Sequence, residues 1–577
     1  MNLRLNVSTA VFVLMAAMLS AQLPKEAMSS ATQLLSSKLT ASGPPSDMSS
    51  KSLPGGLRVD VKRAGQNPYV VQVMSEVSQV PIHTGDVVFV TFESRSPSLG
   101  GGLWSMYAQR NVAPWIGYFS AQGLPGNTWH RYNVKWTSDH EIAPGSMAIT
   151  FHVASRAQEI EFRDFSANNL GHYSGALPFT PLTYPGREAS APWRKEANEK
   201  IDRYRKADVL VHVTDSKGKP VKGAKVHVKQ LRHAYEFGSF VESSLLASNP
   251  DGEQYRKWFL SAYNKATTPM YWADWGWEDP NSQKLYKAYP VWLKEHSITT
   301  KAHVLIYPGW QFMPTRLKKY ENDPKVLWAE MDKHIREKIA FTKPFGFVSW
   351  DVTNETRDLR DLPKIFGSEE IYVRLFKLMH ELDPRPTLYL NENTILTNGG
   401  KTESQQAEFE RMLRYLLKNG APLQGIGMQG HFGEVMTAPP DIWRIVDRFA
   451  KFGLPIQITE FDLPIADPQA QADYTRDLLT AWFAHPATTG FTMWGFWEGS
   501  MWQPAGALVD KNWKVKPNGQ AWLDLVKKRW WSDTTLTTDR FGNAKYRVFK
   551  GDFEFSTGKF SRQVKIHHSA QVRMVLK

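Results

Sequence analysis

The sequence predicts an α/β protein whose central part is a closed (β/α)8 barrel of the TIM type, accompanied by all-β domains. From about residue 233 to residue 528, strand-like apolar segments alternate with stretches of helical periodicity, which is typical of a parallel sheet with helical connections. On both sides of this region the chain shows short runs of alternating apolar and polar residues, separated by Gly, Pro and Asn. At 577 residues, with 42% hydrophobic residues, the chain is long enough to form several cores.

The N-terminal residues 1–21 predict a secretory signal peptide. Arg4 precedes an apolar run from Val11 to Met18, which is too short to span a membrane. A membrane anchor or a buried N-terminal helix is the alternative, because Leu19 is not the small residue expected three positions before the cut. We therefore expect a secreted or periplasmic protein with no membrane span.

Two further N-terminal regions differ in composition. Residues 22–56 are rich in Ser, Ala, Thr, Gly and Pro, which predicts an unstructured linker. Residues 57–185 contain alternating runs bounded by turn residues, which predicts a β-sandwich or jelly roll. Representative runs are Pro68 to Met74, Asp86 to Phe92 and Ser146 to Val153.

Residues 186–232 predict a connector, a helix from Trp193 to Lys206 and a β-hairpin. The hairpin would pair Asp208 to Thr214 with Val221 to Lys229 across a turn rich in Asp, Ser, Gly and Pro. Because two strands alone are marginally stable, we expect the alternating runs of residues 529–577 to complete a small Ig-like β domain. The barrel would then be inserted into this small domain.

The barrel segment, residues 233–528, contains eight candidate strands. They are Glu236 to Val241, Asn264 to Thr268, Lys301 to Tyr307, Phe347 to Val352, Thr387 to Asn391, Gly425 to Gln429, Ile456 to Glu460 and Gly490 to Trp494. Helical spacing appears between them, for example at Glu369 to Leu382, Gln405 to Leu417 and Tyr474 to Phe483. Eight such units fit a closed barrel, whose active sites lie at the C-terminal ends of the strands.

Composition excludes several classes of function. The chain has no cysteine, so it has no disulfide, no thiolate metal site and no cysteine nucleophile. The net charge of +13 is spread along the chain, whereas nucleic-acid binding needs clustered Lys and Arg in a known module. Attraction to an acidic polysaccharide remains as a weaker alternative. We expect no cofactor and no catalytic metal; a structural Ca²⁺ and the oligomeric state stay open.

Two carboxylates at strand ends indicate the chemistry. The fourth strand leads into Trp350-Asp-Val-Thr-Asn-Glu355 and the seventh into Ile458-Thr-Glu-Phe-Asp462, on opposite sides of the barrel mouth. Glycosidic cleavage needs one carboxyl group to protonate the leaving oxygen and another to attack or to activate water. Aromatic rings, which suit the faces of sugars, are frequent in the same loops: Trp272, Trp275, Trp277, Trp310, Trp494, Trp497 and Trp502.

These motifs resemble those of glycoside hydrolase family 10, the endo-β-1,4-xylanases, over about residues 236 to 525. Trp350-Asp-Val-Thr-Asn-Glu355 is similar to the acid/base motif, Ile458-Thr-Glu-Phe-Asp462 to the nucleophile motif, and Gly425-Ile-Gly-Met-Gln-Gly-His431 to the sixth-strand motif. The resemblance implies a retaining mechanism in which Glu460 is the nucleophile and Glu355 the acid/base. Their carboxyl groups are then expected about 5 to 5.5 Å apart.

The resemblance also implies supporting roles. Asn354 would hold the 2-hydroxyl of the sugar at the cleavage site, and His431 would hydrogen-bond Glu460 in an orientation set by Asp462. The substrate-binding residues that we expect are Asn354, His303, Tyr307, Trp310, Gln429, His431, Trp494, Trp502, Trp272 and Asn391, with Asp351 and Asp462 in support.

Two segments depart from the family pattern. Thr267-Thr-Pro-Met-Tyr-Trp272 stands where family xylanases carry a Glu-Asn pair and a Lys, and Pro308-Gly-Trp310 stands where a His and a Gln are usual. We therefore expect the cleavage chemistry to be kept and the recognition of xylan to be altered. Residues 57–185 are similar in arrangement to carbohydrate-binding jelly rolls, with Trp104, Tyr107, Trp115, Tyr118, Trp129 and Tyr132 as candidates for a sugar platform.

The leading hypothesis is hydrolysis of a β-linked polysaccharide or oligosaccharide, foremost of the β-1,4-xylan type. The alternatives are a non-catalytic carbohydrate-binding protein, a hydrolase of a different β-glycan, and transglycosylation by the same two acids. The exact sugar and the choice between endo and exo action stay open.

Overall fold

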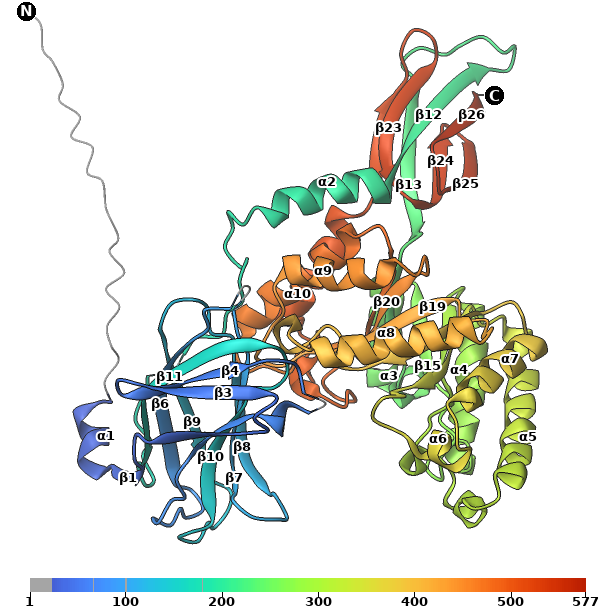
Figure 1. The fold of residues 1–577 in the computed structure, drawn as a ribbon. Helices are drawn as coiled ribbons and strands as arrows, with labels where there is room; N and C mark the ends of the chain where they lie inside the picture. Colours follow the sequence, from blue (N-terminus) through green and yellow to red (C-terminus); the bar gives the residue numbers. More distant parts are fainter. Residues whose placement is uncertain (1–22, 66, 99–100, 179, 577) are drawn as a thin grey trace, which may run out of the picture. The chain divides into compact units, whose positions relative to one another are not determined.

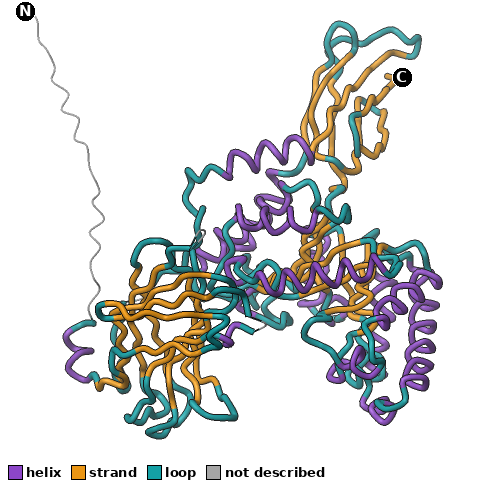
Figure 2. The backbone as a smooth tube through the Cα atoms, viewed as in Figure 1, coloured by secondary structure: helices purple, strands orange, loops and turns teal. Residues whose placement is uncertain are grey.

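The computed structural model describes residues 23–65, 67–98, 101–178 and 180–576. The expected signal peptide at residues 1–21 lies outside these ranges. The chain forms two compact units, residues 1–181 and residues 182–577. The first is built mainly of β-strands, and the second contains the barrel and a small β-sandwich (Figures 1 and 2).

The first unit is a sandwich of two antiparallel sheets. One sheet has the order β3-β4-β11-β6-β9, with β1 paired to β11, and the other has the order β2-β5-β10-β7-β8. Large rings from both sheets fill the core, among them Phe92, Trp104 and Phe151. The strands are β1 (Thr32–Leu35), β2 (Leu39–Ser42), β3 (Met48–Leu53), β4 (Gly56–Val61), β5 (Gln72–Ser75), β6 (Val87–Arg95), β7 (Trp104–Arg110), β8 (Gly117–Gly123), β9 (His130–Thr137), β10 (Met147–His152) and β11 (Gln158–Asn169).

The prediction of an unstructured linker at residues 22–56 is wrong. This segment forms helix α1 (Lys25–Ser30) and the strands β1, β2 and β3, which pair with β11, β5 and β4 of the sandwich. Its strands lie at the edges of the sheets, and most side chains of β3 are exposed. Because an edge strand needs few apolar residues, its Ser-rich and Thr-rich composition looks like that of a linker.

The second unit contains a closed barrel of eight parallel strands, as predicted. Every candidate strand is present: β14 (Glu236–Phe240), β15 (Lys265–Pro269), β16 (Thr299–Ile306), β17 (Ser349–Asn354), β18 (Thr387–Glu392), β19 (Gly425–His431), β20 (Ile456–Asp462) and β21 (Thr488–Met493). The helices between and after them are α3 (Pro250–Ala262), α4 (Pro280–Glu295), α5 (Pro324–Thr342), α6 (Asp361–Ile365), α7 (Glu370–Leu382), α8 (Glu403–Lys418), α9 (Pro439–Ala450), α10 (Pro468–Ala484) and α11 (Pro517–Leu523).

Four of these helices begin with the same local signal. In α3, α4, α5 and α10 a proline occupies the first turn, where its missing N–H is not needed. The residue before each proline is Asn or Asp, and its side chain accepts hydrogen bonds from backbone N–H groups of the first turn. The sequence therefore fixes where these helices start, and with them the lengths of the loops at the barrel mouth.

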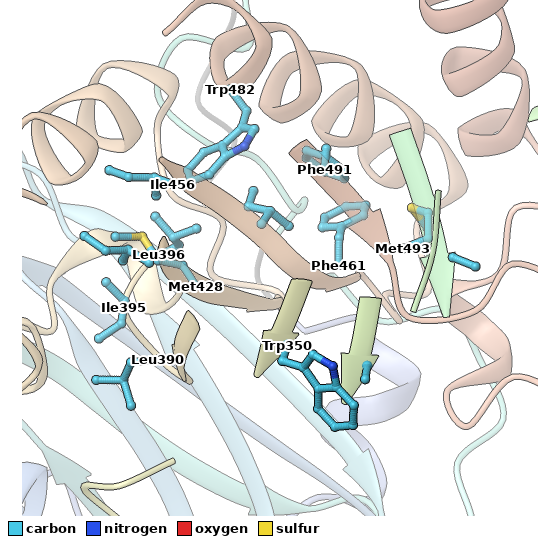
Figure 3. Packing of buried hydrophobic residues seen from close by; sticks show 14 of the residues in the cluster. Trp350, Leu390, Ile395, Leu396, Met428, Ile456, Phe461, Trp482, Phe491 and Met493 are labelled. Atoms are coloured by element: carbon cyan, nitrogen blue, oxygen red, sulfur yellow. The ribbon is translucent and has the colours of Figure 1, made fainter. Parts of the chain in front are cut away.

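The barrel strands are buried on both faces. Apolar side chains such as Ile456 and Phe491 pack toward the helices, with Trp482 of α10 over them (Figure 3). Polar side chains fill the interior: Thr459 donates to Asn391 Oδ1 (2.7 Å), which connects β20 with β18. Because the apolar side chains face the helices, polar side chains at the strand ends are available to build a site.

A small sandwich flanks the barrel. It consists of the sheets β23-β12-β26 and β22-β13-β24-β25, preceded by helix α2 (Trp193–Arg205). Its strands are β12 (Lys206–Asp215), β13 (Lys225–His233), β22 (Asp533–Thr537), β23 (Asn543–Phe549), β24 (Gly551–Thr557), β25 (Phe560–Ile566) and β26 (Ala570–Leu576). The N-terminal and C-terminal flanks of the barrel thus meet in one β domain.

The predicted hairpin between the first two strands of this domain is wrong. β12 pairs with β23 and β26, whereas β13 pairs with β22 and β24, so the two strands lie in different sheets. The turn residues between them join two sheets, because each strand finds its partners in the C-terminal segment. Among the described residues, no helix is long and apolar enough to cross a membrane.

Candidate active site

The two carboxylates of the site stand at the ends of β17 and β20. Glu460 is 3% exposed, and Glu355, directly after β17, is half-buried. Glu355 has a φ of 51°, a left-handed conformation that non-glycine residues rarely adopt. Its backbone N–H donates to the carbonyl oxygen of Asn391 (3.1 Å), which holds this turn against β18. A strained backbone held by a neighbouring strand is typical of functional positions.

Three side-chain amides connect the two carboxylates. Gln429 donates to Glu355 Oε1 (2.8 Å), and Asn391 donates to Glu460 Oε1 (2.6 Å). Both amides also donate to Asn354 Oδ1, at 3.3 and 3.0 Å. The chain of bonds fixes both carboxylates in one frame built from four strands. Because its oxygen is already engaged, Asn354 would contact a substrate through its NH₂ group.

His431 forms the second support of Glu460. One ring nitrogen, Nε2, lies 3.1 Å from Glu460 Oε2, and the other, Nδ1, lies 2.8 Å from Asp462 Oδ2. Burial alone would lower the pKa of His431, but the bonds to Asp462 and Glu460 outweigh it and raise this pKa to about 10. His431 is therefore a cation at neutral pH, and it lies against the Glu460 carboxyl group.

A buried ionic group lies beneath the mouth. Asp351 contacts Lys301 Nζ (2.7 Å) and His303 Nδ1 (2.9 Å), and all three side chains are nearly inaccessible. Burial would raise the pKa of Asp351, but the charge of Lys301 and the bond to His303 hold it below its ordinary value. The Asp351 carboxylate thus orients the His303 ring, which meets Trp494 edge to face at 5.2 Å.

Most of the expected site residues gather at the C-terminal ends of the barrel strands. Trp502 is 56% exposed, and its Nε1 donates to Asp462 Oδ2 (2.9 Å). Trp310 is half-buried in the loop after β16. The expected residues that lie in the barrel strands or in the loops directly after them are Glu355, Glu460, Asn354, His303, Tyr307, Trp310, Gln429, His431, Trp494, Asn391, Asp351 and Asp462.

The prediction that Trp272 contacts the substrate is wrong. Trp272 is 2% exposed, its Nε1 donates to Glu278 (2.8 Å), and its ring stacks on His334 of α5 at 4.1 Å. It lies in the loop after β15 and packs against α5, so a substrate cannot reach it. Trp277 and Trp497 are also buried, at 4% and 7% exposed, so they too serve packing.

Glu242 is a residue of the mouth that the sequence analysis did not identify. It follows β14 and accepts a hydrogen bond from the Ser500 hydroxyl (2.7 Å), which ties down the loop carrying Trp494 and Trp502. Burial raises the pKa of Glu242 to about 7. The rule that polar residues closing a barrel strand face the site would have found it.

Glu392, which closes β18, is a second such residue. It is 1% exposed, and burial raises its pKa to about 8. Its carboxyl group receives contacts from the Thr356 hydroxyl and the Arg357 N–H, both at 3.4 Å. These are the two residues after Glu355, so Glu392 supports the turn that presents the acid/base candidate.

The raised pKa of His431 predicts how stability depends on pH. The His431 cation stabilises the fold fully below its unfolded pKa of about 6.5, and this contribution is lost as pH rises toward 10. We expect His431→Gln to lower the unfolding free energy by about 2 kcal/mol at pH 6 and by clearly less at pH 10. Urea unfolding of both proteins at the two pH values measures this, and an equal loss at both would contradict the prediction.

Residues 273–525 match the family model of glycosyl hydrolase family 10. The matched residues make up less than half of the chain. The anti-sigma-I factor RsgI6 of Acetivibrio thermocellus is 26% identical over 373 residues, which cover 63% of this chain and 46% of that protein. Endo-1,4-beta-xylanase 1 of Arabidopsis thaliana is 28% identical over 366 residues, covering 62% and 37%.

Among solved structures, native xylanase 10B from Thermotoga maritima is similar, with a TM-score of 0.45 and 23% identity, over 51% of this chain and 96% of that one. The chain spans less than half the length of the two curated relatives above.

Proposed function

We propose that the barrel is a glycosyl hydrolase family 10 domain. From this premise, we propose that the protein is a retaining glycoside hydrolase. Its substrates would be β-linked polysaccharides, foremost of the β-1,4-xylan type. The observation that carries the proposal is the pair Glu355 and Glu460, held in one frame by Gln429, Asn354 and Asn391. A buried carboxylate beside a cation and a half-exposed carboxyl group suit the roles of nucleophile and acid/base.

In the first step, Glu460 attacks the anomeric carbon while Glu355 gives its proton to the departing glycosidic oxygen. The bond to the leaving sugar breaks, and a covalent glycosyl ester forms on Glu460. In the second step, Glu355 takes a proton from water, and the resulting oxygen nucleophile displaces Glu460 from the same carbon. Two inversions at one carbon retain the β configuration.

The neighbouring groups assist these steps. The His431 cation lies beside Glu460 Oε2 and would stabilise this carboxylate as the leaving group of the second step. We expect Asn354 and His303 to hold hydroxyls of the sugar that is attacked. Trp494, edge to face with His303, would cover that sugar from the β21 side.

The stereochemistry of the first product tests the proposal. We expect wild-type protein to release the β anomer from xylan or xylo-oligosaccharides, as followed by ¹H NMR before mutarotation. Release of the α anomer would overturn the retaining mechanism. Binding without turnover on xylans, mixed-linkage glucans and acidic glycans would favour a non-catalytic binding protein. Transfer to an added acceptor sugar in place of water would favour transglycosylation.

We further propose that the first unit binds a neutral polysaccharide on the outer face of the sheet β2-β5-β10-β7-β8. Strand pairing aligns Gln72, His152, Ser105 and Gln122 in one row on this face, with Tyr107 in the adjacent row. Tyr107 lies 4.5 Å from the ring of His152, which also meets the half-exposed Tyr69 at 6.0 Å. Amides, hydroxyls and aromatic rings are the groups that recognise neutral sugars.

The outer face of the opposite sheet carries charged side chains that pair with one another. There Arg95 pairs with Glu161 (2.6 Å) and Arg163 with Glu93 (2.6 Å), in a lattice of ion pairs. Trp129, one of the expected platform residues, lies between Arg95 and Arg163, at 4.8 and 4.1 Å from their guanidinium carbons. Trp104 and Tyr132 belong to the core, so the expectation of a platform is wrong for these two.

Tyr107→Ala is expected to weaken binding to insoluble xylan about threefold to tenfold, because ring stacking contributes roughly 0.5–1.5 kcal/mol. Depletion isotherms of the full chain measure this, with Glu460→Gln present in every variant so that the polymer stays intact. Trp129→Ala, on the other face, is the matched control and is expected to bind as the parent does. Equal losses for the two variants would count against the assignment of this face.

A further inference from the structure

The loops after β15 and β16 form an aromatic wall, defined as Tyr271, Trp275, Tyr307 and Phe312. Phe312 stacks in parallel on Tyr307, with ring centroids 3.8 Å apart and an angle of 4°. Tyr271 lies 5.0 Å from Trp275 and 6.5 Å from Phe312, and it meets His303 edge to face at 5.3 Å. The four rings thus form one surface that begins beside the catalytic residues.

The inner and outer members of the wall present different groups. Burial, together with the charge of Glu355, raises the pKa of Tyr307. Burial and the charge of Glu460 likewise raise that of Tyr271. Both hydroxyls therefore stay protonated near the two carboxylates. Phe312 is half-buried and Trp275 is 51% exposed, so the outer part of the wall offers ring faces to a ligand.

The charged side chains of these loops bind one another. Glu278 accepts from Trp272 (2.8 Å) and pairs with Arg316 (2.9 Å). Asp274 accepts from the backbone N–H of Thr315 (3.1 Å). Both acidic side chains are thus already engaged by neighbouring groups of the protein.

Hydrogen-bonding groups and aromatic ring faces respond differently to a substituted sugar hydroxyl. A site that hydrogen-bonds a sugar hydroxyl rejects a substituted hydroxyl strongly, because its own polar groups lose their partners. The ring faces of Trp275 and Phe312 have no such partners to lose, and they gain contact area with an added methyl or acyl group. Substitution of sugar hydroxyls is thus tolerated or favoured at this wall.

We propose that the wall selects O-acylated β-linked glycans, with an acyl-bearing sugar seated against Trp275 and Phe312. This inference rests on the proposed hydrolase activity and names the substrate class within it.

The experiment compares O-acetylated xylo-oligosaccharides with the same preparation after mild alkaline deacetylation. We expect wild-type protein to have a kcat/KM at least threefold higher on the acetylated sample. Trp275→Ala and Phe312→Ala should each remove this preference by lowering kcat/KM on the acetylated sample about tenfold, with a smaller change on the deacetylated one. Phe541→Ala is the matched control, because Phe541 is 56% exposed and lies in the small sandwich, after β22.

Each outcome decides the matter. Hydrolysis of both samples with a preference for the deacetylated one would overturn the inference and leave the hydrolase proposal intact. A preference for the acetylated sample that both wall variants retain would overturn the assignment to this wall. Hydrolysis of neither sample would overturn the proposed function, and the inference with it. Thermal unfolding of Trp275→Ala and Phe312→Ala confirms that any loss arises from folded protein.

Discussion

Replacement of Glu460 by Gln is expected to lower kcat on xylan by about 10⁴-fold or more, a loss comparable to removal of a nucleophile in other enzymes. The amide has nearly the shape of the carboxylate and can keep a bond to Asn391, but it cannot attack the anomeric carbon. Reducing-sugar release measures kcat, and circular dichroism checks the fold.

The matched control is Glu381→Gln, an exposed residue near the C-terminal end of α7. It makes the same chemical change outside the amide frame, so activity close to wild type is expected. If Glu460→Gln retained full activity, Glu460 would not be the nucleophile and the double-displacement mechanism would fail.

Replacement of Glu355 by Ala is expected to have an effect that depends on the leaving group. On xylan, loss of the proton donor should lower kcat/KM by about 10²- to 10⁴-fold. On an aryl β-xyloside whose phenolate departs without protonation, the first step needs no acid, so kcat/KM should fall far less. The second step still lacks its base, so the glycosyl-enzyme should accumulate and both kcat and KM should fall.

Parallel steady-state kinetics on xylan and on the aryl xyloside give this result directly. Equal losses on both substrates would show that Glu355 does not act as the acid. Gln429→Ala is a useful companion, because Gln429 donates to Glu355 Oε1 (2.8 Å) without being able to replace it as an acid. We expect Gln429→Ala to lower kcat/KM less than Glu355→Ala does on xylan, and to a similar extent on both substrates.

The barrel was predictable because its signal is repeated eight times. Several strands are apolar runs that end in polar residues, as in Ile456 to Asp462. Four of the helices also carry their own start signals. Glu355 and Glu460 could be predicted for the same reason, since the C-terminal ends of parallel strands must meet at one mouth. The roles of His431 and Asp462 could be expected only because their motifs resemble those of a known family.

Other features depend on packing that no local pattern contains. Trp272 and Trp275 lie in the same loop, yet one is 2% and the other 51% exposed. Only the position of His334 on α5, which covers Trp272, separates them. The stacking of Phe312 on Tyr307 likewise depends on how the loop after β16 turns back. At the N-terminus, β1 to β3 contain few apolar residues because their partners supply most of the core.

The small sandwich has a consequence for how the chain folds. His212 in β12 contacts Asn543 in β23 across 331 residues of sequence, so this domain closes only after the whole barrel segment has been synthesised. Closing so long a loop carries a large entropic cost unless the barrel has already brought its own ends together. Until then β12 and β13 present unpaired edges, which are prone to aggregation. Pairing with the C-terminal strands protects these edges once the barrel has folded. Truncation before β22, which keeps α11, should therefore reduce the yield of soluble protein.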